Sequence, residues 1–152
     1  MNRGSGEEIR ETTGHLLARV SKAHRGRVGR ELAALGLHPG QELVLAELWR
    51  EDGLRVCELA GSLGVEPPTA TRMVQRLERC GFVERRRDPE DARSFRVYLS
   101  GRGRSAVERV FRCWEQVEQE ALDGLSSEER ALLRGLLERV RGNLEGVTGV
   151  NG

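Results

Sequence analysis

The sequence is poor in aromatic residues and has no long hydrophobic run. Phe, Trp and Tyr make up only 4% of its 152 residues, so a core has to be built mostly from Leu, Val and Ala. No apolar stretch approaches the roughly 18 residues that a membrane-spanning helix needs. The opening residues, MNRGSGEEIRE, also lack the apolar region of a signal peptide. We therefore expect a cytoplasmic protein that does not bind a membrane.

Cysteine and histidine are scarce and scattered. The three cysteines are Cys57, Cys80 and Cys113, and the three histidines are His15, His24 and His38. The cysteines form no CxxC pair, which fits a reduced protein better than a disulfide framework. The histidines form no pair spaced one helical turn apart, and none follows residue 38. We expect no bound metal.

Catalytic motifs are absent as well. No Ser/His/Asp or Cys/His set lies in a supporting local motif, and no glycine-rich phosphate loop is complete. We interpret Gly101 and Gly103, in SGRGRS, as the entry to a helix that Ser100 caps. The sequence therefore predicts a protein that is not an enzyme and that needs no cofactor.

Lysine is almost missing, because 24 of the 25 basic residues are arginine and the exception is Lys22. The net charge is only +1, but the charge is unevenly distributed. Residues 67–104 hold ten Arg against five Asp or Glu, whereas residues 105–130 hold three Arg against seven acids. This segregation suits a basic face that meets an anion. An ordinary solvated surface explains the same distribution equally well.

Hydrophobic periodicity predicts a mainly α-helical fold with a small β-hairpin. Helices are expected over residues 7–35, about 40–50, about 57–63, the segment VEPPTATRMVQRLERCG and residues 102–123. A last helix is expected to start in LSSEER, where Ser126 or Ser127 can cap it. Strands are expected at Phe82–Arg86 and Phe95–Leu99, around a charged loop at Arg87–Ala92, and LRV near residue 55 suits a short strand. The last helix is expected to bury Leu132, Leu133, Leu136, Leu137 and Val140.

The segment VEPPTATRMVQRLERCG is amphipathic when it is drawn as a helix. Its apolar arc holds Ala70, Met73, Val74 and Leu77. The opposite arc holds Pro68, Arg72, Gln75 and Arg79, flanked by Thr69, Thr71 and Arg76. Adjacent prolines are tolerated at a helix start, where no backbone N–H donor is needed. Arg, Gln and Thr can hydrogen-bond to base edges in a major groove.

The order of the elements around this helix predicts a winged helix-turn-helix. A short helix comes first, and Gly64 supplies a left-handed turn before the amphipathic helix. The basic hairpin then follows directly, as the wing of such a domain does.

The stretch GLRVCELAGSLGVEPPTATRMVQRLERCGFVERRRDPEDARSFRVYLSGRGR resembles the DNA-binding core of the MarR family of bacterial transcription regulators. The most specific parts are LGVEPPTATRMVQRLE and DPEDARSFRVYLS. The resemblance implies an obligate homodimer that binds a pseudo-palindromic operator in double-stranded DNA, commonly as a repressor released by a small ligand or by oxidation. It also implies that Arg93 reaches the minor groove and that Asp91 holds Arg93 and the hairpin in shape. The expected DNA-binding residues are Pro68, Thr69, Thr71, Arg72, Gln75, Arg76, Arg85, Arg86, Arg87 and Arg93.

The expected organisation places the winged domain between dimerisation helices. It assigns residues 1–36 to an N-terminal dimerisation helix, 37–101 to the winged helix-turn-helix, 102–146 to C-terminal dimerisation helices and 147–152 to a tail. Long apolar stripes at both ends of the chain favour a dimer, because one small winged domain cannot bury them.

Three further interpretations stay open at this point. A ligand pocket is expected between the winged domain and the dimerisation helices, with His38, Trp49 and Trp114 as wall candidates, although both tryptophans also suit simple packing. Cys57, close to Arg55 at a helix start, is a candidate redox switch, or only a small substitute for serine. A helical dimer without specific DNA binding would use the same apolar stripes.

Overall fold

The computed structural model describes residues 4–148, which form two compact units divided between Val117 and Glu118. The helices are α1 (Gly4–Arg10), α2 (Thr13–Ala33), α3 (Gln41–Arg50), α4 (Val56–Leu63), α5 (Pro67–Arg79), α6 (Gly101–Ala121) and α7 (Ser127–Thr148). The strands are β1 (Leu54–Arg55), β2 (Val83–Arg87) and β3 (Phe95–Leu99). The expected fold class, mainly α with a small β wing, is therefore confirmed. No helix within the described range is both long and apolar enough to cross a bilayer.

The N-terminal helix expected over residues 7–35 is wrong, because the chain breaks into α1 and α2. Thr12 causes the break. Its hydroxyl donates to the carbonyl oxygen of Ile9 at 2.7 Å and accepts the backbone N–H of His15 at 3.1 Å, so it caps α2. The apolar periodicity continues across this cap, which is why the pattern alone did not reveal it.

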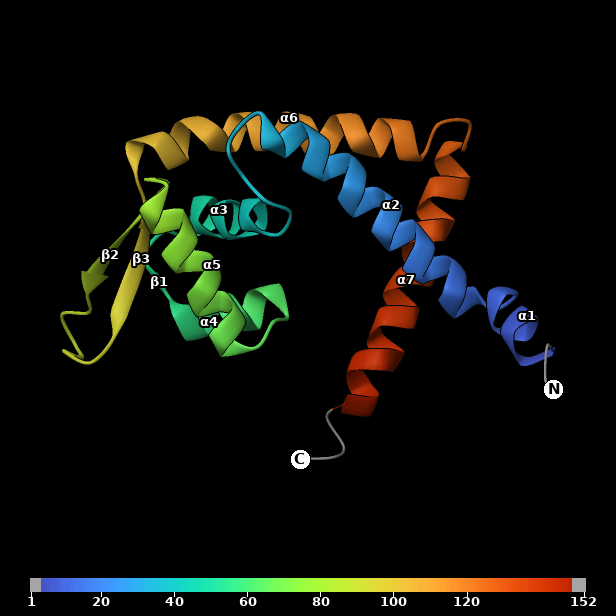
Figure 1. Cartoon of the computed structure of the whole chain (residues 1–152), viewed down its shortest axis with the longest axis horizontal. Coiled ribbons are helices and arrows are strands. Elements are labelled where there is room, and N and C mark those ends of the chain that lie inside the picture. Colours follow the sequence, from blue (N-terminus) through green and yellow to red (C-terminus); the bar gives the residue numbers. More distant parts are fainter. Residues whose placement is uncertain (1–3, 149–152) are drawn as a thin grey trace. The chain divides into compact units, whose positions relative to one another are not determined.

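The wing is a three-stranded antiparallel sheet with the order β1-β3-β2. Val83 lies opposite Leu99 and Arg87 opposite Phe95, while Leu54 of β1 pairs with Val97. β2 begins one residue later than expected, because the Phe82 N–H donates to the Leu77 carbonyl and closes the end of α5. Figure 1 shows the sheet beside α3, α4 and α5.

The core of the first unit is built mainly from Leu and Val, as the composition predicted. Its fully buried side chains are Val28, Leu32, Val44, Leu45, Leu48, Leu59, Val74, Leu77, Phe82, Val97, Val107 and Val110. They come from α2 through α6 and from the sheet, so one core fixes the helix-turn-helix and the wing together.

The second unit contains the end of α6 and the whole of α7. Ser126 caps α7 as expected, since its hydroxyl accepts the Glu129 N–H at 3.1 Å. The expected burial of the last helix is wrong for the single chain: Leu132, Leu133, Leu136 and Leu137 are 38–63% exposed. A pair of helices has too few neighbours to cover such a stripe. The expected tail begins inside α7, and residues 149–152 lie outside the described part of the chain.

Gly103 marks a close approach between the start of α6 and the turn that leads into β2. A Cβ atom built on Gly103 would overlap the carbonyl oxygen of Phe82 and would lie 3.1 Å from Cδ2 of Leu99. The Gly103 N–H also donates to the hydroxyl of Ser100 at 3.0 Å, which confirms Ser100 as the cap. The helix therefore packs here only because the residue has no side chain.

Replacing Gly103 by alanine should lower the free energy of unfolding by about 1–3 kcal/mol, because the new methyl group has to push backbone atoms apart. Gly101→Ala is the matched control, since a Cβ at Gly101 meets nothing within 4 Å. Urea denaturation of both variants measures the difference. Equal free energies of unfolding would contradict the close contact.

Candidate nucleic-acid interface

Helix α5 is held by its apolar side. Ala70, Val74 and Leu77 are at most 1% exposed, whereas Arg72 and Gln75 are exposed. Pro67 and Pro68 occupy its first positions, which confirms the predicted helix entry. The polar face of α5 thus points away from the core.

The turn before α5 has the predicted left-handed residue. Gly64 has φ +64°, and the next residue, Val65, donates its N–H to the carbonyl of Ala60 at 3.0 Å. This pattern closes the C-terminal end of α4 and redirects the chain into α5. Helices α4 and α5 therefore form the expected helix-turn-helix.

The predicted DNA-binding residues fall on three neighbouring segments. Pro68, Thr69, Thr71, Arg72, Gln75 and Arg76 lie on α5, Arg85, Arg86 and Arg87 lie on β2, and Arg93 lies in the loop between β2 and β3. All of them are exposed except Thr69, which is half-buried. One face of α5 and the hairpin thus lie in the same unit, and the hydrogen-bond donors of their side chains are accessible to solvent.

The arginines of β2 differ in their surroundings. Arg85 donates to Glu78 on α5 at 3.0 Å, and this contact lowers the pKa of Glu78. Arg86 lies 3.3 Å from Glu84, with its guanidinium carbon 4.4 Å from the ring centre of Tyr98. Arg87, by contrast, makes no ion pair with any described residue.

Asp91 shapes the tip of the wing loop through the backbone. One of its carboxylate oxygens accepts the Arg93 N–H at 3.0 Å, and the other accepts the Ser94 hydroxyl at 2.9 Å. These bonds hold the pKa of Asp91 below its ordinary value. Asp91 thus orients the backbone of Arg93, and no ion pair joins it to the Arg93 guanidinium among the described residues.

A second carboxylate of the wing, that of Asp88, is not among the site residues predicted from the sequence. Its side chain is fully buried between Arg55 and Arg96, although it follows a strand of exposed arginines. Composition predicts a solvated loop residue there. Its partners lie in other strands, so no local spacing could have indicated the burial.

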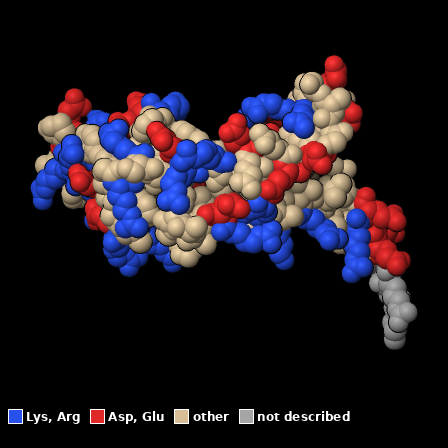
Figure 2. Space-filling model, turned by 90° about the horizontal axis from the view of Figure 1, so that it is seen from above, with Lys and Arg blue, Asp and Glu red and all other residues tan. Residues whose placement is uncertain are grey.

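Charge on the first unit is more balanced than the arginine count of residues 67–104 indicates. Three carboxylates of that segment, Glu78, Glu84 and Asp88, each pair with an arginine. On the face shown in Figure 2, basic and acidic side chains are interspersed. Within residues 4–148, no three His, Cys, Asp or Glu side chains lie close enough to hold a metal ion.

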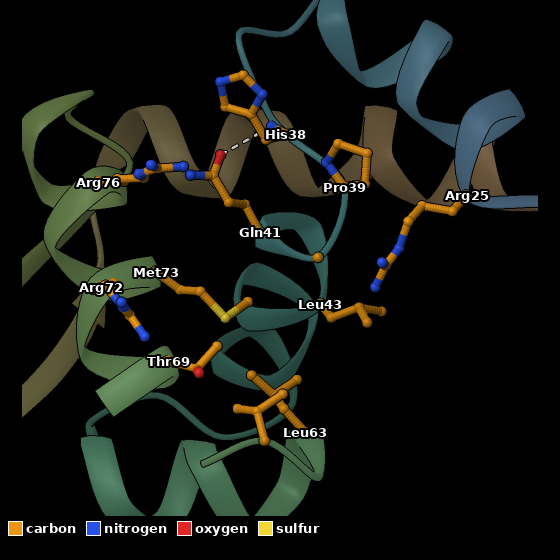
Figure 3. A pocket seen from close by; sticks show the side chains of 12 residues that line it. Arg25, His38, Pro39, Gln41, Leu43, Leu63, Thr69, Arg72, Met73 and Arg76 are labelled. Carbon is orange, nitrogen blue, oxygen red and sulfur yellow. Dashed lines mark hydrogen bonds between the residues drawn. The ribbon is translucent and has the colours of Figure 1, made fainter. Parts of the chain in front are cut away.

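A cavity of about 520 Å³ lies beside α5. Arg72 and Met73 extend toward it from α5 and Arg25 from α2, while Arg76 lies at its edge (Figure 3). His38 lines the cavity too, and its backbone N–H donates to the Gln41 side chain at 2.9 Å. Apolar side chains complete the wall: Leu43, Leu63 and Val65. The cavity therefore combines an apolar lining with three guanidinium groups.

The other two pocket candidates lie elsewhere. Trp49 is 47% exposed and does not line this cavity. Trp114 lines a smaller cavity of about 120 Å³ and packs against His24, with ring centres 5.0 Å apart. The structure therefore does not bring His38, Trp49 and Trp114 together.

Cys57 is exposed in the first turn of α4. The residue that caps this helix is Arg55, and Cys57 follows two residues later, inside the helix. The Arg55 N–H donates to Glu58 at 2.7 Å in that role. A redox role for Cys57 stays a prediction.

Glu42 is a buried carboxylate that lines the smaller cavity, and it is only 3% exposed. It accepts the Gly40 N–H at 2.7 Å, and the indole N–H of Trp114 lies near it without a well-formed hydrogen bond. Burial raises the pKa of Glu42 above its ordinary 4.5, against the opposing effect of nearby N–H groups and Arg25.

The model of the MarR family matches residues 37–95. The chain is similar to YdgJ of Bacillus subtilis (strain 168), an uncharacterized HTH-type transcriptional regulator, with 32% identity over 115 residues that cover 76% of this chain and 70% of YdgJ. It is also similar to YybA, another uncharacterized HTH-type transcriptional regulator of that organism, at 30% identity over 76% of this chain and 77% of YybA.

Solved structures have the same fold over most of the chain. A crystal structure of MarR has a TM-score of 0.78 and 30% identity, covering 98% of this chain and 97% of that one. A mutant MarR from E. coli complexed with operator DNA has a TM-score of 0.78 and 29% identity, covering 84% and 91%. The regulator SlyA has a TM-score of 0.80 at 28% identity, covering 86% and 92%.

The contribution of Glu42 to the free energy of unfolding should fall as the pH rises. The folded chain holds the Glu42 proton more tightly than the unfolded chain, so this contribution favours folding at low pH. It is lost as the pH rises from 4.5 through the raised pKa. Glu42→Gln should therefore gain stability relative to the wild type between pH 4.5 and neutrality.

Urea unfolding at several pH values tests this prediction. Glu51→Gln, at an exposed position just after α3, controls for the loss of a carboxylate. If the free energies of unfolding of Glu42→Gln and the wild type differ by the same amount at every pH, burial does not shift the pKa of Glu42.

Proposed function

Since the chain belongs to the MarR family of transcription regulators, we propose that it is a homodimeric, sequence-specific DNA-binding repressor that a small anionic molecule releases. The observation that supports this most directly is the exposed Arg, Gln and Thr face of α5 beside an arginine-bearing wing. We also propose a cytoplasmic location, as expected from the sequence, because a regulator of this kind has to reach the chromosome. The proposed activity is binding, without catalysis.

In the proposed complex, α5 enters the major groove. Arg72, Gln75 and Arg76 read or position bases, because their long side chains carry donors that match base edges. Pro68, Thr69 and Thr71 lie near the start of α5, where compact side chains allow close approach to the DNA. The buried positions Ala70, Val74 and Leu77 support this orientation, since they fix which face of α5 is exposed.

The wing is proposed to follow the DNA backbone and to place Arg93 in the minor groove. A narrow minor groove has a strong negative potential that attracts an inserted arginine. Arg85, Arg86 and Arg87 are proposed phosphate contacts. The present ion pairs of Arg85 and Arg86 are on the surface, where such pairs contribute little, so exchanging them for phosphate is energetically feasible.

A second copy of the chain is the proposed partner of the exposed apolar side chains. Ile9, Leu16 and Val20 in the N-terminal helices are 57–61% exposed, and the leucines of α7 are also exposed. Exposed apolar surface of this extent is typical of an interaction site. A two-fold dimer would give two copies of α5, which match a pseudo-palindromic operator.

The cavity beside α5 is the proposed effector site, and its chemistry favours an anion with an apolar body. Its volume of about 520 Å³ lies within the usual range for small-molecule sites. Arg72 and Arg76 line the cavity and are also proposed DNA contacts, so a carboxylate bound there would draw the same side chains away from bases. Arg25, on α2, supplies a third positive charge that is not part of the DNA-binding face.

Arg72→Ala and Arg93→Ala should each weaken binding to an operator selected from a random-sequence pool, by about 1–3 kcal/mol for a base-reading arginine. The first should also relax sequence preference in the major groove. Fluorescence anisotropy across a salt series gives both affinity and slope, with Arg109→Ala, an exposed arginine on α6, as control. Unchanged binding in both variants would exclude this orientation.

The dimer should persist at micromolar concentration, because association would bury the exposed leucines of α7. Leu133→Glu combined with Leu137→Glu should give a monomer, since charges at both positions oppose burial. Sedimentation velocity distinguishes the two states, and Glu138→Gln on the same helix is the control. A monomeric wild type contradicts the homodimer.

Benzoate should compete with operator DNA more strongly than the neutral analogue benzamide, because only benzoate carries a charge for the guanidinium groups. Arg25→Met should weaken benzoate binding and leave operator affinity nearly unchanged. Titration calorimetry without DNA and anisotropy with DNA measure the two effects. The site assignment is wrong if benzoate and benzamide act alike, or if Arg25→Met binds benzoate as the wild type does.

A further inference from the structure

A buried carboxylate joins the wing to the helix-turn-helix. Asp88 follows β2 directly, and its side chain has no exposed surface. One carboxylate oxygen accepts the Arg55 Nε at 2.8 Å and lies 3.3 Å from the Arg96 Nε. The other accepts the Glu90 N–H at 3.0 Å. The three groups that contact this carboxylate are therefore all donors.

The two arginines come from different parts of the unit. Arg55 ends β1 and caps α4, the first helix of the helix-turn-helix. Arg96 lies in β3, and its Nη1 donates to the carbonyl oxygen of Gly53 at 3.0 Å. One carboxylate thus connects the start of the wing loop with the central strand and with the entry to α4.

Asp88 and Asp91 act at different levels of the same loop. Asp91 bonds to Arg93 and Ser94 near the tip. Asp88 closes the base, because its backbone N–H donates to the Ser94 carbonyl at 3.0 Å while its side chain holds the two arginines. Arg93 lies between these two sets of bonds, so the direction of its backbone depends on both.

The Glu90 N–H, together with the two arginines, holds the pKa of Asp88 below its ordinary value. The hydrogen bond between Arg55 and Asp88 also raises the pKa of Arg55. Asp88 and Arg55 therefore stay charged at neutral pH. Loss of the carboxylate would leave two guanidinium groups facing each other across its place, and like charges repel.

We infer that Asp88 is a positioning residue for DNA recognition, which fixes the wing carrying Arg93 at a set angle to the helix-turn-helix through Arg55 and Arg96. This inference rests on the proposed DNA-binding function. A pre-organised wing loses less conformational freedom when Arg93 enters a groove, so it raises affinity for the correct site.

Two simpler roles predict different results. If Asp88 acted only as a negative charge near DNA, removing it would tighten binding to any duplex. If it only stabilised the fold, the affinity of the folded fraction would not change. A positioning role predicts weaker operator binding despite the added positive charge, with binding to a scrambled duplex unchanged or tighter.

The experiment compares Asp88→Asn with Glu90→Gln, an exposed neighbour whose replacement changes the net charge equally. Operator and scrambled-duplex affinities are measured by anisotropy, with the active fraction determined by titration. Asp88→Asn should lose at least tenfold in operator affinity, and Glu90→Gln should not. Arg55→Gln is a milder variant, because Arg96 still pairs with Asp88. The double variant Asp88→Asn/Arg55→Gln should lose little more operator affinity than Asp88→Asn alone, if Asp88 and Arg55 act through their mutual contact.

A DNA-free arm separates this inference from the proposed function. Hydrogen exchange at the amides of residues 88 and 90–94 should be faster in Asp88→Asn than in Glu90→Gln. Equal exchange, or equal operator affinity in the two variants, overturns the positioning role. A wild type that does not distinguish operator from scrambled duplex instead contradicts the proposed function, and the exchange result still decides whether Asp88 holds the wing.

Discussion

The structure depends first on the burial of one face of α5. Ala70, Val74 and Leu77 fit against α3 and α4 with almost no exposed surface, and this packing sets the rotation of the helix about its axis. Once the rotation is set, Arg72 and Gln75 must face outward. The wing follows after a single turn at Gly81, whose φ of +79° suits glycine. The same core therefore holds α5 and the strands of the hairpin together.

The carboxylates of the winged unit divide its arginines into two groups. Asp52 accepts the Leu99 N–H at 2.9 Å and pairs with Arg104 at 2.6 Å, and Asp88 holds Arg55 and Arg96. These arginines are part of the framework. Arg72, Arg76, Arg87 and Arg93 make no ion pair with described residues, and the proposed function assigns all four to DNA or effector. Net charge is a poor guide to such a site, because it also counts arginines and carboxylates that pair with each other inside the framework.

Local sequence patterns predicted most helices, strands and turns, but they did not predict contacts between residues far apart in the sequence. The bounds of β3, the left-handed Gly64 and the cap at Ser126 follow from spacing and residue type within a few positions. The burial of Asp88 depends on arginines from two other strands, and β1 becomes the third strand only by pairing with distant β3. The wall of the pocket could not be predicted for a similar reason: His38 lines the cavity beside α5, whereas Trp114 lines a smaller one, and only the fold decides such surroundings.

The most direct test of the account is a structure of the protein bound to its selected operator. The account predicts two copies of α5 in successive major grooves, about 34 Å apart, with each Arg93 in a flanking minor groove. It also predicts that Asp88 stays paired with Arg55 and Arg96 in the complex. A complex in which the DNA contacts another face, with α5 or Arg93 turned toward solvent, would contradict the central claim.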